Sequence, residues 1–463
     1  MVDHLAALAL LHGGARELLA FSAVGLAVSS LDDLFIDAVF LSRLTLRRLT
    51  VYRRHPRARA GRLTRPAGAM AMAIIVPAWD EADVIGAMLR DLTRKLDYPA
   101  YRVFVGVYPN DPATHAEVAG IADPRIELVV CTRPGPTTKA DCLNHLWRAM
   151  VAYEARHGVF KAVVLHDAED VADPLELRVF DHLIPRLAMV QLPVVPLVDA
   201  QSRWIAGHYM DEFAETHLKD MAVREALGAA VPSAGVACAI DRTMLGRIAD
   251  AAAGAPFDAA CLTEDYELGF RIKALGGRGA LVRIIGPTGV VATREHFPGD
   301  LEGALRQKTR WLLGIAFGGW DRLGWRSGWA DRLMLLRDRK AIVAALLTII
   351  AYVAGLLAMI DLALLHVVPG TQGFAPLVAP DGWLADVLTF TTVVLGWRLA
   401  MRAVLSGHVN GWREGLRSIP RVVIGNAINA LAAVRATRRY LSMRRGRSQL
   451  VWDKTAHRFP GTP

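Results

Sequence analysis

Cysteine is scarce in this sequence and shows no metal-binding pattern. The 463 residues include four cysteines, none of them in a CxxC spacing: Cys131, Cys142, Cys238 and Cys261. A zinc site and a disulfide framework are therefore not expected. All four cysteines fall in the part of the chain that we assign to the cytoplasm, where thiols stay reduced.

Aromatic residues make up only 7% of the sequence and are not regularly interleaved with its basic residues. The formal net charge is +9, but the arginines gather beside apolar segments, in the ranges 43–65 and 435–447. Such flanks are typical of the cytoplasmic side of a membrane protein, and they also attract anionic lipid. A single-stranded nucleic acid would instead need base-stacking aromatics along a basic groove. We therefore expect a membrane surface, and no nucleic acid, beside these clusters.

The N-terminus has no clear basic n-region or small-residue cleavage site, which argues against a cleaved signal peptide. Apolar residues are abundant, at 53%, and they gather in separate segments. The first segment, residues 18–41, is predicted to be an anchor helix with its N-terminus outside. Asp32, Asp33 and Asp37 interrupt its second half. We expect these carboxylates either to approach an interface or to pair with other helices.

Two further apolar segments, 341–365 and 383–405, are long enough to cross a bilayer. The loop between them, 366–382, carries almost no basic residues and is expected outside. Residues 301–336 are rich in Trp and Arg, which predicts a helix pair in the interfacial plane. Residues 422–433 are too short for a span and are predicted to be interfacial. Three spans then leave the C-terminus in the cytoplasm.

Strand-like and helical segments alternate between the first two apolar segments. Short buried-strand patterns occur at 72–76, 103–108, 126–131 and 162–165, and helical stretches at 82–92 and 139–156. This alternation predicts βαβ units and a mainly parallel sheet. In such sheets ligands bind beyond the carboxyl ends of the strands.

Three carboxylates, Asp167, Glu169 and Asp170, directly follow the strand predicted at 162–165. A hard divalent cation such as Mg²⁺ or Mn²⁺ takes one or two carboxylates and completes its shell with phosphate oxygens and water. The alternative is an acidic turn before a helix that starts at Asp173. These residues alone support both interpretations equally.

Five other motifs accompany the acidic cluster in a fixed order: Ile74–Glu81, Tyr108–Asp111, Lys139–Asn144, Thr263–Asp265 and Gln307–Trp311. Together they resemble the inverting, family 2 glycosyltransferases, over about residues 71–311. The resemblance implies an α/β fold class: a GT-A (nucleotide-diphospho-sugar transferase) domain with a mainly parallel sheet, plus transmembrane and interfacial helices.

The wider sequence is similar to one branch of that family, the catalytic part of the NfrB-type, phage-adsorption protein B proteins. The similarity includes Leu31–Phe35, Tyr108–Thr114, the His-Asp-Ala-Glu-Asp form of the acidic cluster, and Trp452–Pro460. Members of this branch often continue into a cyclic-di-GMP-binding domain. This sequence ends at Pro463, so we expect that module to be absent or supplied by a separate regulatory protein.

The predicted organisation therefore has six parts. They are an N-terminal membrane anchor (1–42), a basic linker (43–70), the GT-A domain (71–298), interfacial helices with the QxxRW-type motif (299–338), two transmembrane helices (339–405) and a cytoplasmic or interfacial C-terminal region (406–463).

The family resemblance also implies a donor site. Pro77, Trp79 and Glu81 follow the first strand, where the family holds the nucleoside, and Asp111 would contact the base. Lys139 would neutralise the diphosphate, which a point charge does well.

The metal would bind at the DxD positions, which Asp167 and Glu169 occupy. Glu169 replaces the second Asp of the family motif. Whether Glu169 or Asp170 completes the metal site is left open.

Asp265 is the candidate general base, with Glu264 beside it, because an inverting transfer needs one carboxylate to take the proton of the acceptor hydroxyl. The alternative is that both residues only favour the start of a helix at 266–274.

Gln307, Arg310 and Trp311 share one helical face. Arg310 would stabilise the leaving group, and Trp311 would stack under an acceptor sugar. Without the family context, this trio would be an interfacial Trp with snorkelling arginine.

The sequence thus predicts a membrane-bound, metal-dependent glycosyltransferase in the bacterial inner membrane. It would move a sugar from a nucleoside-diphosphate sugar, expected to be UDP-linked, to a growing exopolysaccharide. The alternatives are a single-transfer enzyme that makes a glycolipid on a lipid-linked acceptor, and a non-catalytic scaffold or receptor component of an envelope polysaccharide secretion system. Three spans are few for a channel, so an outer-membrane or secretion partner is expected if polymer is exported.

Overall fold

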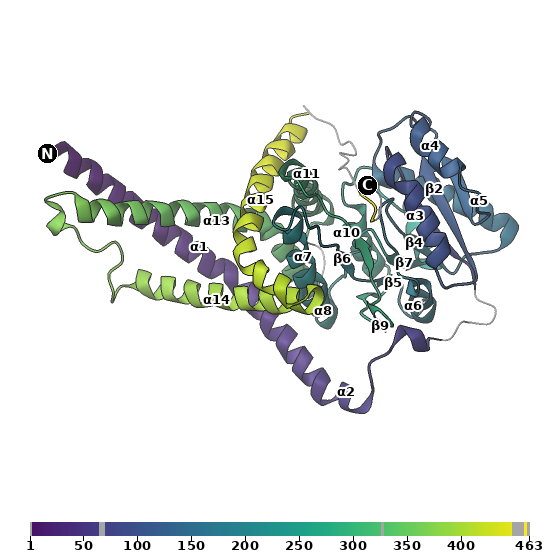
Figure 1. Cartoon of the computed structure of the whole chain (residues 1–463), viewed down its shortest axis with the longest axis horizontal. Helices are drawn as coiled ribbons and strands as arrows, with labels where there is room; N and C mark the ends of the chain where they lie inside the picture. The colour runs from purple at the N-terminus through teal and green to yellow at the C-terminus, as the bar shows by residue number, and fades with distance from the viewer. Residues whose placement is uncertain (1, 64–69, 326–327, 447–457, 461–463) are drawn as a thin grey trace.

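The computed structural model describes residues 2–63, 70–325, 328–446 and 458–460 (Figure 1). Three long helices lie together and extend away from the rest of the protein: α1 (Val2–Leu49), α13 (Trp329–Val367) and α14 (Trp383–Asn410). Within the described ranges these three are long and apolar enough to cross a membrane, in agreement with the predicted number of spans.

A seven-stranded sheet forms the centre of the remaining domain, in the order β3-β2-β1-β4-β7-β5-β8. Its strands are β1 (Met72–Pro77), β2 (Tyr101–Val107), β3 (Ile126–Val130), β4 (Ala162–Leu165), β5 (Met189–Gln191), β7 (Cys238–Asp241) and β8 (Gly279–Leu281). Only β7 runs antiparallel to its two neighbours. The predicted mainly parallel sheet is confirmed.

Helices cover both faces of this sheet, so its central strands are buried throughout. In β1, Met72, Ile74 and Val76 pack on one face, and Ala73 and Ile75 on the other. The first face is covered by α3 (Ala82–Lys95), α4 (Pro112–Ala119) and α6 (Glu176–Leu183). The second is covered by α5 (Lys139–His157), α9 (Arg242–Asp250) and α10 (Glu264–Ala274).

Further helices stand between the sheet and the three long helices. They are α7 (Ile205–Glu215), the π-helical turn η2 (Thr216–Asp220), α8 (Met221–Ala226), α11 (Leu301–Leu312), the π-helical turn η3 (Leu313–Gly318), α12 (Gly319–Leu323) and α15 (Trp412–Arg444). Near them, β6 (Val194–Pro196) pairs in parallel with β11 (Thr293–Glu295).

Two element boundaries differ from the sequence-based expectation. The predicted limits at 42/43 and 338/339 both fall inside continuous helices, α1 and α13. The start of α13 lies in the segment predicted to be an interfacial helix pair because it is rich in Trp and Arg. It can continue into an apolar helix because Ala330, Asp331, Met334 and Leu335 are buried by the adjoining domain.

Residues 422–433, predicted to be interfacial, form the middle of α15. This helix packs against α7, α11, α13 and α14. Its small residues Ala432, Ala433 and Ala436 are fully buried. Such side chains allow close approach between helices, so α15 packs against the domain and against the long helices α13 and α14 alike.

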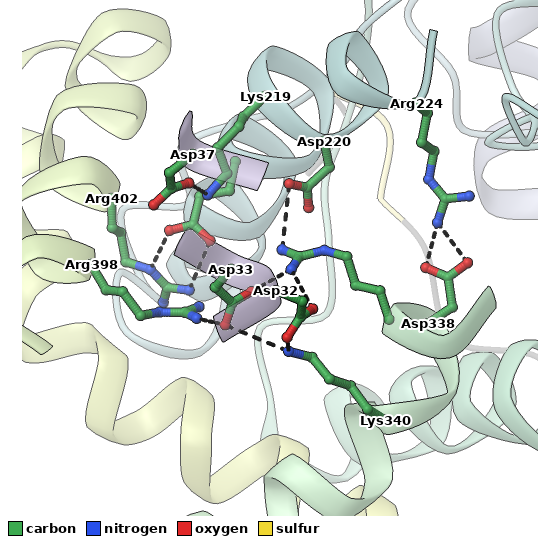
Figure 2. A network of polar contacts seen from close by, with 12 residues as sticks. Asp32, Asp33, Asp37, Lys219, Asp220, Arg224, Asp338, Lys340, Arg398 and Arg402 are labelled. Carbon is green, nitrogen blue, oxygen red and sulfur yellow. Dashed lines mark hydrogen bonds and ion pairs between the residues drawn. The ribbon is translucent and has the colours of Figure 1, made fainter. Parts of the chain in front are cut away.

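The acidic residues of α1 pair with basic residues of other helices (Figure 2). The Asp37 carboxylate lies 2.8 Å from the Lys219 ammonium group of η2 and accepts a hydrogen bond of 2.8 Å from the Trp397 indole. The other pairs join Asp32 and Asp33 to basic residues of α13 and α14, namely Arg337, Lys340 and Arg398. Of the two sequence-based alternatives, pairing between helices is observed, and approach to an interface stays a prediction. A carboxylate packed among helices without such a partner would be costly.

Gly269 sets the packing of α10, the helix that begins at Glu264. A Cβ atom at this position would lie 2.1 Å from the Val231 carbonyl oxygen, which is backbone and cannot move aside cheaply. We expect Gly269→Ala to destabilise the protein by about 1–3 kcal/mol, as overpacking does. Thermal unfolding of the purified chain in detergent measures the change.

Gly396→Ala inside α14 is the matched control, because its new Cβ would meet no atom within 4 Å. Its Tm should not fall, since alanine favours the helix. Equal Tm values for Gly269→Ala and the wild type would contradict the close contact.

Candidate active site

One pocket opens at the carboxyl ends of β1 and β4 and is closed on its far side by α11. Ten of the sequence-predicted site residues line it: Pro77, Glu81, Lys139, Asp167, Glu169, Glu264, Asp265, Gln307, Arg310 and Trp311. Trp79, Asp111 and Asp170 do not line it. The sheet thus gathers in one place side chains that are more than two hundred residues apart in the sequence.

The turn after β1 is held by α4. The Asp111 carboxylate caps α4 through the Thr114 amide (3.2 Å) and also accepts a hydrogen bond from the Asp80 amide (2.6 Å). The Glu81 amide donates to the Thr114 hydroxyl (2.9 Å). Asp111 therefore orders the loop that presents Pro77 and Glu81, and its contact with a base remains a prediction.

Trp79 packs beside this turn. Its ring meets the Tyr108 ring edge to face, with centroids 5.1 Å apart. A Cβ at Gly135 would lie 2.5 Å from the indole, so the backbone of this loop can approach the ring only at a glycine.

Lys139 is the cation at the centre of the pocket. It occupies the first turn of α5, and its Nζ lies 2.5 Å from Asp167 Oδ1. Burial opposes the charged form, but the nearby carboxylates of Asp167, Glu264 and Asp265 outweigh it and raise the pKa of Lys139. Lys139 is therefore a fixed positive charge.

Asp170 points beneath the pocket. Its Oδ2 lies 2.7 Å from His166 Nδ1 and accepts a hydrogen bond of 3.1 Å from the Asp167 amide. Glu176 binds the other ring nitrogen of His166 at 2.8 Å. Burial opposes protonation of the imidazole, yet these carboxylates raise the pKa of His166 to about 10. A buried imidazolium thus holds the acidic loop, and of the two candidates for the second metal ligand only Glu169 lines the pocket.

Glu264 and Asp265 form the first turn of α10, so the sequence-based alternative of a helix start is also a correct description of their position. Burial comes first among the causes that raise the pKa of both carboxyl groups. Gly235, at φ 78°, lies against Asp265: a Cβ there would be 2.7 Å from Asp265 Oδ2. Only glycine both adopts this backbone conformation readily and leaves room for the carboxylate.

Glu295 is a pocket residue that the sequence reasoning missed. It ends β11 and is buried in the pocket wall. Burial, followed by repulsion from Asp170, Glu169 and Asp167, raises the pKa of Glu295. The sequence signal that could have identified Glu295 is its place at the end of a short strand. That signal is not enough, because the pairing of β11 with the distant β6 cannot be predicted from a local pattern.

The α11 motif closes the pocket with polar groups. The Gln307 side chain is buried, and its Oε1 has no hydrogen-bond partner within the described residues. Arg310 lines the pocket and, in the same part of the chain, forms no ion pair within 4.0 Å. Both residues line the pocket, so their polar groups are available to a ligand there.

Aromatic rings form the wall next to this motif. Trp311, Phe213 and Phe297 line the pocket. Trp311 meets Tyr209 edge to face, at 5.9 Å between centroids. The Lys308 ammonium group lies 5.1 Å from the centroids of both rings and pairs with Glu212 of α7. The orientation of Trp311 is thus set by α7 as well as by α11.

Comparison with protein families identifies the domain that carries this pocket. The model described as "Glycosyltransferase like family 2" matches residues 69–314. The chain belongs to glycosyltransferase family 2. The predicted GT-A fold class and the family resemblance are both confirmed.

Within family 2, the chain is 37% identical over 458 residues to the bacteriophage adsorption protein B of Escherichia coli strain K12. It is equally similar to the bacteriophage N4 adsorption protein B of Escherichia coli O157:H7. The match covers 95% of this chain and 61% of each relative, so the chain spans about three-fifths of their length.

A solved mannosyltransferase from Pyrobaculum calidifontis, in complex with GDP-Man and Mn²⁺, has the same fold. Its TM-score is 0.50 at 18% identity, over 90% of this chain and 99% of that one.

Asp167 lines the pocket, whereas Asp170 binds the buried His166 and supports the loop from below. Asp170→Ala leaves the buried His166 imidazolium with one partner fewer and should destabilise the protein by about 3–5 kcal/mol. Asp167→Ala removes a side chain that is 28% exposed and should change stability by at most about 1 kcal/mol. Thermal unfolding of both variants under identical conditions measures the difference. Equal losses of Tm would contradict a supporting role for Asp170.

Proposed function

We propose that the chain is a membrane-bound, metal-dependent, inverting glycosyltransferase that uses a nucleoside-diphosphate sugar. One observation carries the proposal: Asp167, Glu169, Asp265 and Arg310 converge on a single pocket at the carboxyl edge of a mainly parallel sheet. Acidic groups for a metal, a carboxylate base and a cation for a leaving group are the parts that this reaction needs.

The donor would bind along the carboxyl edge of β1 and β4. Pro77, Glu81 and the loop ordered by Asp111 would hold the nucleoside, and Lys139 would neutralise the diphosphate. We expect UDP as the nucleotide, as in the sequence-based interpretation. The mannosyltransferase neighbour was solved with GDP-Man, so the direct test compares UDP with GDP.

The carboxylates of the pocket fit a divalent cation. Asp167, Glu169 and Glu295 face a space that also receives Glu264 and Asp265, against Lys139 and Arg310 as the pocket's cations. No group of three His, Cys, Asp or Glu side chains in the described ranges is arranged to hold a metal ion by itself. Mg²⁺ commonly takes one or two carboxylates and adds phosphate oxygens and water. Asp167 and Glu169 would therefore hold Mg²⁺ or Mn²⁺ together with the donor.

A bound metal would offset charge on the diphosphate, and the side chains of the chain would carry out the rest of the chemistry. Asp265 would take the proton of the acceptor hydroxyl as that oxygen attacks the anomeric carbon. Lys139 and Arg310 would stabilise the negative charge on the departing diphosphate. Because the displacement is a single step, no covalent enzyme intermediate is needed.

The aromatic wall would receive the acceptor. Trp311, Phe213 and Phe297 present apolar faces on which a sugar ring can stack. We propose a growing exopolysaccharide as the acceptor, with a lipid-linked acceptor as the alternative. The arginine-rich flanks favour a cytoplasmic domain at the bacterial inner membrane, with the N-terminus outside and the C-terminus inside. Polymer export would need an outer-membrane or secretion partner, and regulation a separate protein.

Nucleotide binding tests the metal site. UDP should bind the wild-type protein in Mn²⁺ or Mg²⁺ and lose most of its affinity in EDTA. Asp167→Ala should show the weak, EDTA-insensitive affinity even with metal present. Asp250→Ala, an exposed residue at the end of α9, is the control and should bind as the wild type does. Isothermal titration gives the four affinities, and an EDTA-insensitive wild type would refute metal-assisted binding.

Replacement of the proposed base separates catalysis from binding. Asp265→Asn keeps the side-chain shape, so donor and metal should bind normally. The rate at which UDP is released in the presence of the acceptor should fall by a factor of about 10²–10⁴, the usual contribution of a general base. Asp250→Asn serves as the control. Transfer by Asp265→Asn at the wild-type rate would leave Asp265 as a helix-start residue only, and binding without turnover in the wild type would favour the scaffold alternative.

A further inference from the structure

An apolar groove runs along the second half of α1 and starts among the α1 carboxylates shown in Figure 2. It is lined by Phe35, Ala38, Val39 and Leu46, together with Arg43 and Arg47. These positions recur at helical spacing, so they share one face. Phe35 is 42% exposed and Leu46 is 61% exposed. The groove is therefore an open apolar surface that ends at two guanidinium groups.

A third arginine, Arg57, lies near Arg47 because both side chains lie over the ring of Tyr52. The guanidinium carbons of Arg47 and Arg57 lie 5.4 Å and 4.6 Å from the centroid of Tyr52. After α2 (Val51–Arg54) the chain turns back, and Arg59 forms a β-bridge with Ile285 of the catalytic domain. This return brings the linker beside α1.

Arg283, two residues before that bridge partner, adds a fourth guanidinium group. Partial burial lowers the pKa of Arg283, and repulsion by Arg57, Arg43 and Arg47 lowers it further. The four guanidinium groups come from three parts of the chain. Two come from α1, one from the linker and one from the catalytic domain.

These arginines have too few acidic partners. Glu225 pairs with Arg43 at 3.3 Å. In the ranges that the structure describes, Arg47, Arg57 and Arg283 form no ion pair, and the buried Nε of Arg47 has no hydrogen-bond partner. A protein rarely leaves a buried donor unmatched. The cluster therefore has the charge and the free donor expected of an anion site.

The position along α1 defines the kind of anion. At 1.5 Å per residue, 48 residues extend about 72 Å, far more than the roughly 30 Å of a bilayer core. The ion pairs of Asp32, Asp33 and Asp37 mark the end of the apolar part of the helix bundle. The groove starts at that level, and the arginines follow at the level where lipid headgroups would lie.

We propose that the groove and Arg43, Arg47, Arg57 and Arg283 form a binding site for one anionic phospholipid of the cytoplasmic leaflet. The phosphate would bind at the guanidinium groups of Arg47 and Arg57 beside the Tyr52 ring, and an acyl chain would lie along Phe35, Val39 and Leu46. A free phosphate has no apolar part that could bind in the groove. The site rests on the membrane placement proposed above and is independent of sugar transfer. It would fix the linker, and with it the catalytic domain, against the membrane surface.

Lipid titration of the full chain in detergent tests the site. Dioctanoyl phosphatidylglycerol should raise the Tm saturably, whereas dioctanoyl phosphatidylcholine and inorganic phosphate should not. Arg47→Gln/Arg57→Gln should weaken the apparent affinity for phosphatidylglycerol about thirtyfold, from the usual contribution of two arginines near a lipid surface. Leu46→Gln keeps every charge and should weaken it about tenfold through lost apolar contact.

Arg48→Gln/Arg54→Gln is the matched control, because it removes the same charge from the same segment at two arginines that neither line the groove nor lie over the Tyr52 ring. Its affinity should stay within about twofold of the wild type. Equal losses in the two double variants would replace the site by diffuse attraction. Equal effects of inorganic phosphate and phosphatidylglycerol, or an unchanged affinity in Leu46→Gln, would also overturn a lipid site. If a double variant fails to fold, Leu46→Gln still tests the lipid site, together with the comparison of phosphatidylglycerol and inorganic phosphate on the wild-type protein.

Discussion

Repulsion among carboxylates at the carboxyl edge of the sheet is the constraint on which the pocket depends. Asp167, Glu264 and Asp265 surround Lys139, which keeps its charge despite burial because of them. Beneath them, the two ring nitrogens of the buried His166 pair with Asp170 and Glu176. Negative charge still exceeds positive charge in the pocket. Such a site is stabilised by ligands that bring cations, which is why a diphosphate would enter together with a metal.

The same principle governs the attachment to the spanning helices. The carboxylates of α1 are matched by cations from α13, α14 and η2, as Figure 2 shows. Since η2 continues α7, one continuous helical segment joins Lys219 at the spanning helices to Phe213 in the pocket wall. The charged network therefore fixes the aromatic wall relative to the three long helices.

Much of the fold could be predicted because its signals are local. The strand at 72–77 is a short apolar run and the helix at 139–157 is bounded by a threonine cap and a glycine. Elements that depend on contacts between distant parts of the chain were harder to predict. Residues 422–433 were too short for a span, and only their packing on α7 and α11 explains a helix of 33 residues there. Glu295 was not predicted as a site residue, because its strand, β11, pairs with a strand about a hundred residues away.

The sequence by itself determined the first four strands of the sheet with the helices between them, and the three apolar segments, because spacing and hydrophobic period are properties of the chain. It also placed Asp167, Glu169, Asp265 and Arg310 in family motifs. The tertiary structure alone decided which carboxylates face the pocket. Asp170 and Glu169 are neighbours with the same chemistry, yet one is turned down to His166 and the other lines the pocket. The direction of a carboxylate depends on where its charge is matched, and those partners meet only when the chain has folded.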